Sequence, residues 1–199
     1  QAVRLRLGIP ADGTVLLTVG RLAQQKGQRL AIEALAQLQE AGQTAWLLLA
    51  GTGREGPALQ RLTRRLGLAE RVHFLGQVPQ GELPAVYAAA DLCLFPWLGA
   101  EMFPLTLLEA IASGVPPICS AVGSAPSILQ QGHIGRVVQP GKLAPLTQAV
   151  LDLLQAPEER RRMAAAARNR AQSEYCLETM VARTEAILAA HLAPLAAEP

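Results

Sequence analysis

Cysteine is scarce in this chain. Its 199 residues include only three cysteines, Cys93, Cys119 and Cys176, which lie far apart in the sequence. Their number and spacing match neither a disulfide framework nor the ligand pattern of a zinc site. Cys93 and Cys119 fall in short apolar segments, where cysteine acts as a small hydrophobic residue. We therefore expect free thiols and a reducing, cytoplasmic location.

Long apolar runs are also missing. No run approaches the roughly 18 residues that a membrane-spanning helix needs, and the start of the chain does not resemble a signal peptide. The chain begins with Gln1 rather than Met, so we expect it to be a piece of a longer protein. Half of its residues are hydrophobic and 17% are charged, a balance that predicts a globular fold rather than disorder.

The sequence carries no large excess of one charge. The formal net charge is +2, and only Lys26 and Lys142 of the 18 basic residues are lysines. This balance is unlike that of a protein dedicated to nucleic acid. We therefore expect no nucleic-acid partner.

Short apolar segments alternate with amphipathic ones along the chain. Runs of about four to six apolar residues are followed by segments whose leucines recur at helical spacing. This alternation predicts a parallel sheet with helices on both faces, which is a doubly wound, Rossmann-like α/β domain over residues 1–199. The expected strands are 14–19, 45–50, 72–75, 91–95, 116–119 and 135–138, and the expected helices are 30–38, 59–66, 82–90, 105–112, 143–154, 157–172 and 177–191.

Ligands of such sheets bind at the carboxyl ends of the strands, near a switch in strand order. The loops at that edge are 20–27, 51–56, 76–79, 96–103 and 120–126.

One of these loops matches a dinucleotide-binding motif. Gly51-Thr52-Gly53-Arg54-Glu55-Gly56 has the pattern G-x-G-x-x-G between a strand and a helix. A site for NAD also needs an acid near the end of the next strand. That strand ends Phe74-Leu75-Gly76-Gln77, without a carboxylate. We interpret the motif as a tight turn whose backbone lies near a ligand pocket.

A second loop, 20–27, begins and ends with glycine and carries two cations, Arg21 and Lys26. Glycine lets the backbone approach a ligand closely. An arginine can grip a phosphate through two donors, and a lysine adds a mobile point charge. The loop therefore suits a diphosphate, although two solvated surface cations would give the same pattern.

The segment 96–110 carries the most chemical information. Pro104 is expected as the first residue of a helix, where its missing N–H costs nothing. The free N–H groups of Leu105 and Thr106 at that helix start favour a phosphate. Glu101 precedes the helix, and Glu109 lies within its nearly all-apolar sequence. A buried carboxylate is costly unless it is paired or used, which favours a functional role over a surface one.

Together these motifs resemble the C-terminal domain of a family-4 retaining glycosyltransferase of the GT-B fold. The family signature of Glu, seven residues, Glu is met by Glu101 and Glu109. The loop at 20–27, the segment 74–76 and the segment 109–116 follow the family pattern in the right order. The resemblance covers about residues 15–191. It departs from the common pattern at Thr52, Pro104, Lys142 and the segment 123–127, which leaves the identity of the donor open.

The resemblance implies a role for each matching residue. Arg21 and Lys26 would neutralise the donor diphosphate, Glu101 would accept hydrogen bonds from the transferred sugar, and Glu109 would hold the ribose hydroxyls. The segment 74–78 would contact the base. We expect no metal and no cofactor. The predicted donor site comprises Gly20, Arg21, Lys26, Gly51, Phe74, Leu75, Gly76, Glu101, Phe103, Pro104, Leu105, Thr106 and Glu109, with Arg21, Lys26 and Glu101 as its catalytic members.

The resemblance further implies a donor linked to UDP or GDP, and a partner domain at the N-terminal side that binds the acceptor. The last helix, 177–191, is expected to pack on that missing half. For the full-length protein it suggests polysaccharide biosynthesis at the inner face of the membrane. Two other hypotheses stay open, a sugar-nucleotide epimerase of the same fold and a non-catalytic scaffold. An epimerase would need other catalytic acids and histidines, and a scaffold would tolerate Glu101→Ala in the full-length protein.

Overall fold

The computed structural model describes residues 2–99 and 101–192, and within them six strands form one parallel sheet. The strand order is β3-β2-β1-β4-β5-β6, so the order reverses between β1 and β4. This confirms the predicted doubly wound α/β fold. The strands are β1 (Thr14–Val19), β2 (Ala45–Ala50), β3 (Val72–Gly76), β4 (Leu92–Phe95), β5 (Pro117–Ser120) and β6 (Arg136–Val138).

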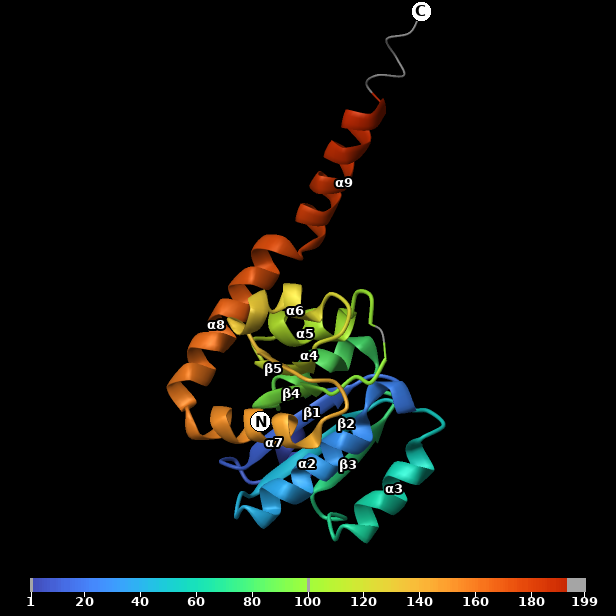
Figure 1. Ribbon diagram of the computed structural model, residues 1–199, viewed down its shortest axis with the longest axis vertical. Helices are drawn as coiled ribbons and strands as arrows, with labels where there is room; N and C mark the ends of the chain where they lie inside the picture. Colours follow the sequence, from blue (N-terminus) through green and yellow to red (C-terminus); the bar gives the residue numbers. More distant parts are fainter. Residues whose placement is uncertain (1, 100, 193–199) are drawn as a thin grey trace, which may run out of the picture.

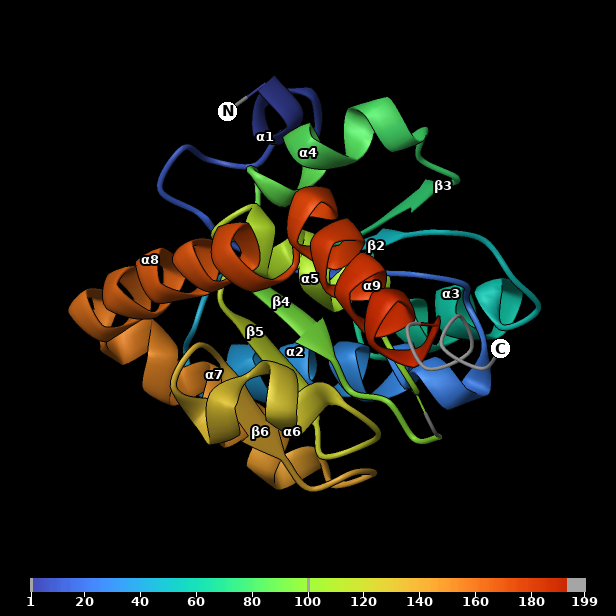
Figure 2. The same cartoon turned by 90° about the horizontal axis from the view of Figure 1, so that it is seen from above.

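Helices cover both faces of this sheet (Figures 1 and 2). One face carries α1 (Ala2–Arg6), α4 (Leu83–Tyr87), α5 (Leu105–Ala112) and α6 (Ala125–Ile128), with α8 (Pro157–Glu174) packed on α5. The other face carries α2 (Gln28–Glu40), α3 (Gly56–Arg65) and α7 (Leu143–Gln155). Three short 3-10 turns, η1 (Gln24–Lys26), η2 (Gln80–Glu82) and η3 (Gln130–Gly132), complete the connections.

The two faces explain why the strands are apolar at almost every position. Successive side chains of a strand point to opposite faces. Leu16 and Leu47 therefore pack with α2, α3 and α7, whereas Leu17 and Leu48 pack with the helices of the opposite face. All four leucines are fully buried.

The cysteines behave as the sequence predicts. All three are free, and Cys93 and Cys119 are buried in β4 and β5. Burial raises the pKa of the Cys93 thiol, and it raises the pKa of Cys119 to about 12. Both thiols are therefore protonated at neutral pH and act as packing groups.

The structure corrects some of the expected element boundaries. The helix expected at 82–90 is shorter, because the turn η2 precedes α4 and the helix ends at Tyr87. The short helices α1 and α6 were not expected, since five and four residues are too few to show a helical period. Ala100, in the expected loop 96–103, lies outside the described residues.

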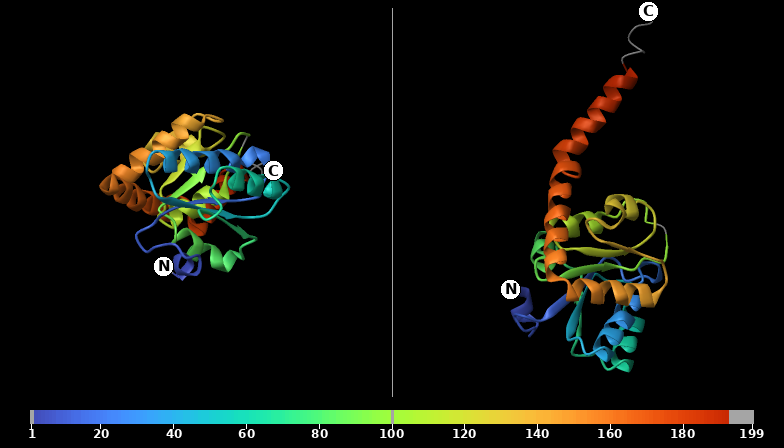
Figure 3. Two further views of the ribbon diagram at one scale, coloured as in Figure 1. Left: turned by 90° about the horizontal axis from the view of Figure 1, so that it is seen from below. Right: turned by 60° about the vertical axis from the view of Figure 1, so that its left-hand side comes forward.

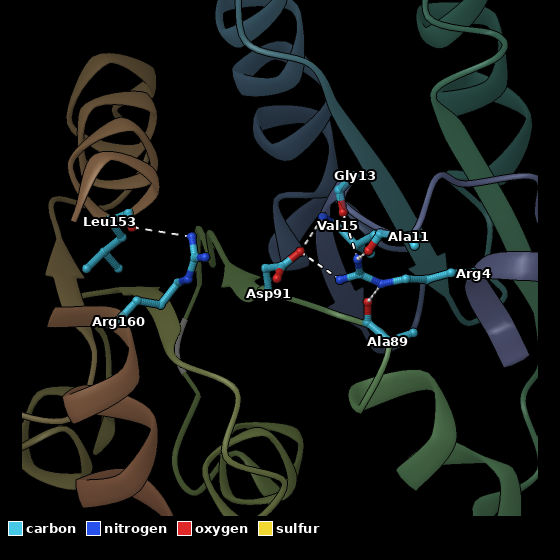
Figure 4. A network of polar contacts seen from close by, with 8 residues as sticks. All are labelled: Arg4, Ala11, Gly13, Val15, Ala89, Asp91, Leu153 and Arg160. Carbon is cyan, nitrogen blue, oxygen red and sulfur yellow. Dashed lines mark hydrogen bonds and ion pairs between the residues drawn. The ribbon is translucent and has the colours of Figure 1, made fainter. Parts of the chain in front are cut away.

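A partly buried polar network fixes α1 against the amino-terminal edge of the sheet (Figure 4). Arg4 donates to the carbonyl oxygens of Ala89, Ala11 and Gly13 and forms an ion pair of 2.8 Å with Asp91. The same Asp91 oxygen accepts the backbone N–H of Val15 at 2.8 Å.

The last described helix, α9 (Leu177–Leu192), extends away from the body of the molecule beyond α8 (Figures 1 and 3). Met180, Ile187 and Leu188 are exposed, as expected from the sequence. No helix among the described residues is long and apolar enough to cross a bilayer.

Candidate functional site

The switch in strand order brings two of the predicted loops together. The loop after β1 and the loop after β4 leave neighbouring strands at the same edge of the sheet. Leu98 donates its N–H to the carbonyl oxygen of Gln25 at 2.8 Å. Gly27 lies so close to Pro96 that a Cβ on Gly27 would be 1.8 Å from the Pro96 oxygen. These two loops therefore form the edge of the sheet where ligands bind in folds of this type, and we call this edge the crevice.

Lys26 and Glu101 meet in this crevice. Lys26 Nζ forms an ion pair with Glu101 Oε1, and the two side chains are only 21% and 16% exposed. The ammonium also lies 6.0 Å from the centroid of the Trp97 ring, within reach of a cation–π contact. Two residues that the sequence assigned to different parts of a donor are thus direct neighbours. The pairing itself was not predicted.

Arg21 does not join this ion pair. Its side chain is exposed, and no hydrogen bond or ion pair joins it to another described residue. Its backbone is held, because the buried side chain of Gln28 donates to the Arg21 carbonyl oxygen at 2.9 Å. The guanidinium can therefore turn toward a ligand from an anchored loop.

Glycines lock the ends of the first three strands together. A Cβ on Gly51 would lie 2.0 Å from the Gly20 oxygen. Gly51 donates its N–H to Gly76 at 2.7 Å. A Cβ on Gly53 would lie 2.2 Å from the Leu22 oxygen. These contacts support the interpretation of the motif at 51–56 as a tight turn, and they bring Gly20, Gly51 and Gly76 to one edge.

The start of α5 follows the loop that carries Glu101. Pro104 is not the first residue of the helix, as expected, but its N-cap, with φ −79° and ψ 102°. The fixed φ of proline suits this extended position equally well. Leu105 and Thr106 then begin the helix, and no described residue accepts their N–H groups. Phe103 just before them is exposed, with its ring centroid 6.4 Å from that of Tyr175.

Glu109 lies further along α5. The apolar sequence around it predicted a buried carboxylate, and the structure shows a half-buried one. Tyr87 of α4 donates its hydroxyl to Glu109 Oε2 at 2.8 Å. The same hydroxyl lies 3.1 Å from the Thr106 carbonyl oxygen. This contact lets α5 keep a carboxylate inside an otherwise apolar helix.

Glu109 borders two hollows. One, of about 300 Å³, lies between α4 and α5. Its lining begins at Gln80, two residues after the segment expected to contact a base. Its lining is Gln80, Leu83, Pro84, Tyr87, Glu109, Ala112 and Ser113. The other, of about 420 Å³, is mainly apolar and lies between α5 and the end of α8. The end of β3 is formed by Phe74, Leu75 and Gly76, which are half-buried.

Sequence reasoning missed Gln28, Tyr87 and Gly123. A Cβ on Gly123 would lie 1.7 Å from the Glu101 carbonyl oxygen, so the loop after β5 supports Glu101. Nothing in the local sequence signals these contacts, because each joins elements that are distant in the chain. Among the described residues, no cluster of three or more His, Cys, Asp or Glu side chains is arranged to hold a metal ion.

Comparisons with known sequences agree on one family. A family model described as "Glycosyl transferases group 1" matches residues 2–170. A GDP-mannose-dependent alpha-(1-6)-phosphatidylinositol monomannoside mannosyltransferase of Mycolicibacterium smegmatis is 34% identical, over 94% of this chain and 50% of that protein. A 2-deoxystreptamine glucosyltransferase of Streptomyces kanamyceticus is 31% identical, over 79% of this chain and 41% of that protein. The chain thus spans about half the length of the curated relatives it matches.

Solved structures give the same result. HepE of Anabaena, in complex with UDP and glucose, has a TM-score of 0.87 and 26% identity, over 95% of this chain and 51% of HepE. The C-terminal domain of the group 1 glycosyl transferase LpcC of Francisella tularensis has a TM-score of 0.78 over 89% of this chain and 93% of that domain. Its 23% identity supports the fold alone. This chain therefore belongs to the glycosyl transferases group 1 family and has the Rossmann-like fold of one half of a GT-B enzyme.

Proposed function

We propose that this chain forms the donor-binding half of a glycosyltransferase that transfers a sugar from a nucleoside-diphosphate sugar with retention of configuration. The observation that carries the proposal is the Lys26–Glu101 ion pair in the crevice at the strand-order switch. A cation there suits a phosphate, and a carboxylate suits sugar hydroxyls. The two groups lie beside each other, as the phosphate and the sugar do in such a donor.

The diphosphate is held, in this proposal, by Arg21, Lys26 and the free N–H groups of Leu105 and Thr106. The positive end of α5 and the two side chains stabilise the negative charge that develops on the leaving nucleotide. Donor binding replaces the carboxylate of Glu101 as the neighbour of Lys26 with phosphate oxygens. Glu101 is then free to accept hydrogen bonds from the transferred sugar. No metal or other cofactor takes part in this proposal.

The nucleoside lies, in this proposal, along the edge formed by β3 and α5. Glu109 holds the ribose hydroxyls, and the segment 74–78 contacts the base. HepE was solved with UDP and with UDP-glucose, and the mycobacterial relative is named as GDP-mannose-dependent. These names support a UDP- or GDP-linked donor.

The acceptor site belongs, in this proposal, to a second domain. The relatives are about twice as long as this chain, which supports a missing acceptor-binding half on which α9 packs. WaaG, which is 29% identical, is described as involved in lipopolysaccharide biosynthesis. We therefore propose a lipid-linked or polysaccharide acceptor, reached by a cytoplasmic protein at the membrane surface. The isolated chain should bind nucleotide and transfer no sugar.

A thermal-shift measurement tests the donor site. We expect UDP, GDP or ADP at about ten times its Kd to stabilise the chain by about 1.4 kcal/mol and raise Tm by about 4 °C. The corresponding nucleoside without phosphates should give a much smaller shift. Arg21→Ala and Lys26→Ala should each abolish the shift, because each removes a phosphate ligand.

Arg65→Ala is the matched control, because Arg65 is an exposed arginine at the far end of α3. Its shift should equal that of the unmodified chain. If none of the three nucleotides changes Tm at millimolar concentration, the proposed donor site is wrong. An equal loss of shift in Arg65→Ala would show that the effect is not local to the crevice.

A further inference from the structure

Tyr87 is buried where a phenylalanine would pack equally well. The residue is 1% exposed and lies at the end of α4. A buried hydroxyl is costly unless it finds a hydrogen-bond partner. Its partner here is Glu109 Oε2, at 2.8 Å. The hydroxyl therefore has a specific task on α5, which the fold alone does not require.

The hydroxyl acts as a donor and not as an acceptor. Burial raises the pKa of Tyr87 above its ordinary value, and the negative charge of Glu109 raises it further. The single proton has two acceptors within reach, Glu109 Oε2 and the Thr106 carbonyl oxygen at 3.1 Å. The charged and nearer carboxylate makes the stronger hydrogen bond.

We propose that Tyr87 is a positioning residue that fixes the carboxylate of Glu109 for the ribose of the donor. This inference rests on the proposed function, in which Glu109 holds the ribose hydroxyls. One carboxylate oxygen is oriented by Tyr87. No described residue donates a hydrogen bond to the other oxygen, Oε1. A carboxylate has about four acceptor positions, so enough remain for two neighbouring hydroxyls.

The surroundings fit a ribose. Tyr87 and Glu109 both line the hollow of about 300 Å³ between α4 and α5. Gln80 lines the same hollow and lies two residues after the segment 74–78, where the base is proposed to lie. The ribose would therefore lie between the base and the phosphate-binding start of α5.

Tyr87 also connects the ribose and phosphate parts of the site. Its hydroxyl touches the carbonyl of Thr106, and the N–H of Thr106 is a proposed phosphate ligand. The aromatic ring has few rotatable bonds and is enclosed by the core, so little freedom is lost when a donor binds. The proposed site is thereby preorganised on two rigid helices.

Nucleotides that lack ribose hydroxyls test this inference. Calorimetry on the intact chain would compare UDP with 2′,3′-dideoxy-UDP, and GDP with 2′,3′-dideoxy-GDP. We expect the ribonucleotide to bind about tenfold more tightly than its dideoxy analogue. In Tyr87→Phe this preference should fall by about threefold or more, while binding of the dideoxy analogue changes little. Glu109→Ala should abolish the preference, and adding Tyr87→Phe to Glu109→Ala should cause no further loss.

Tyr175→Phe is the matched control, because Tyr175 lines the hollow on the other side of Glu109. It should keep the full preference. A Tyr87→Phe variant that loses affinity equally for the ribonucleotide and its dideoxy analogue would show a merely structural role. This result would overturn the inference and leave the proposed nucleotide site standing. Equal binding of the ribonucleotide and its dideoxy analogue by the unmodified chain would overturn the ribose role of Glu109 as well. No binding of any nucleotide would overturn both the proposed function and this inference.

Discussion

Asp91 satisfies two partners with one carboxylate oxygen. Oδ2 accepts from Arg4 and from the backbone N–H of Val15, both at 2.8 Å. The ion pair is only partly exposed, and Arg4 donates three further hydrogen bonds to backbone carbonyls. Asp91 therefore joins α1, β1 and the start of β4 at a single point.

Asp91→Ala should lower the free energy of unfolding by about 2–3 kcal/mol. The change leaves a buried N–H and a guanidinium without their acceptor, and such losses cost more than the net value of the bonds. Urea unfolding measures this directly. Glu33→Ala is the control, because Glu33 pairs with the exposed Arg29 one helical turn away, an interaction worth about 0.3–0.5 kcal/mol. Equal losses in the two variants would contradict the special role of Asp91.

At the same scale, residue types were easier to predict than residue contacts. Arg21, Lys26, Glu101 and Glu109 were identified because charged side chains interrupt glycine-rich or apolar segments at the ligand edge of the sheet. The ion pair between Lys26 and Glu101 joins residues 75 positions apart. Such a contact follows from the strand order, which a single sequence does not reveal. Tyr87 was missed for the same reason.

At the scale of elements, the crevice depends on the contact between the loops after β1 and β4. Gly27 adopts a positive φ of 68°, and a side chain there would collide with the backbone of Pro96. The loops can approach each other only because this position has no Cβ.

Gly27→Ala should separate these loops. We expect a loss of stability about 1–3 kcal/mol larger than that of Gly42→Ala. Gly42 has a similar φ of 77° but nothing within 4 Å of the added methyl group, so it carries only the strain of the left-handed backbone. Gly27→Ala should also lose the nucleotide-dependent rise in Tm, which Gly42→Ala should keep. Equal unfolding midpoints for both variants would contradict the importance of this contact.

Elements with a clear apolar run or helical period were predicted well. Four-to-six-residue apolar runs identified all the strands described here to within one residue at each end, because parallel strands covered on both faces are apolar at almost every position. The short helices α1 and α6 have too few residues for a period. Pro104 was placed one position too far into α5, since proline fits both the N-cap and the first turn.

At the scale of the whole molecule, α9 contrasts with the rest of the fold. Its side chains from Met180 to His191 are exposed, whereas the other long helices bury one face. Leu177, Met180, Ile187 and Leu188 lie within one stripe at helical spacing, and each is more than half exposed. An exposed apolar stripe of this kind is typical of an interaction surface.

Because α9 buries almost nothing in the chain, changes on it should alter association and leave stability almost unaffected. We expect the isolated chain to self-associate as its concentration rises, and Met180→Lys, Ile187→Lys and Leu188→Lys together to suppress this.

The control replaces Ala182, Ala186 and Ala189 by lysine, because these alanines lie on the opposite face of the helix. It adds the same charge and should leave association in place. Light scattering measures the mass, and urea unfolding should show less than about 0.5 kcal/mol of change in both variants. Equal suppression by the two sets would mean that charge repulsion, not the apolar stripe, controls association.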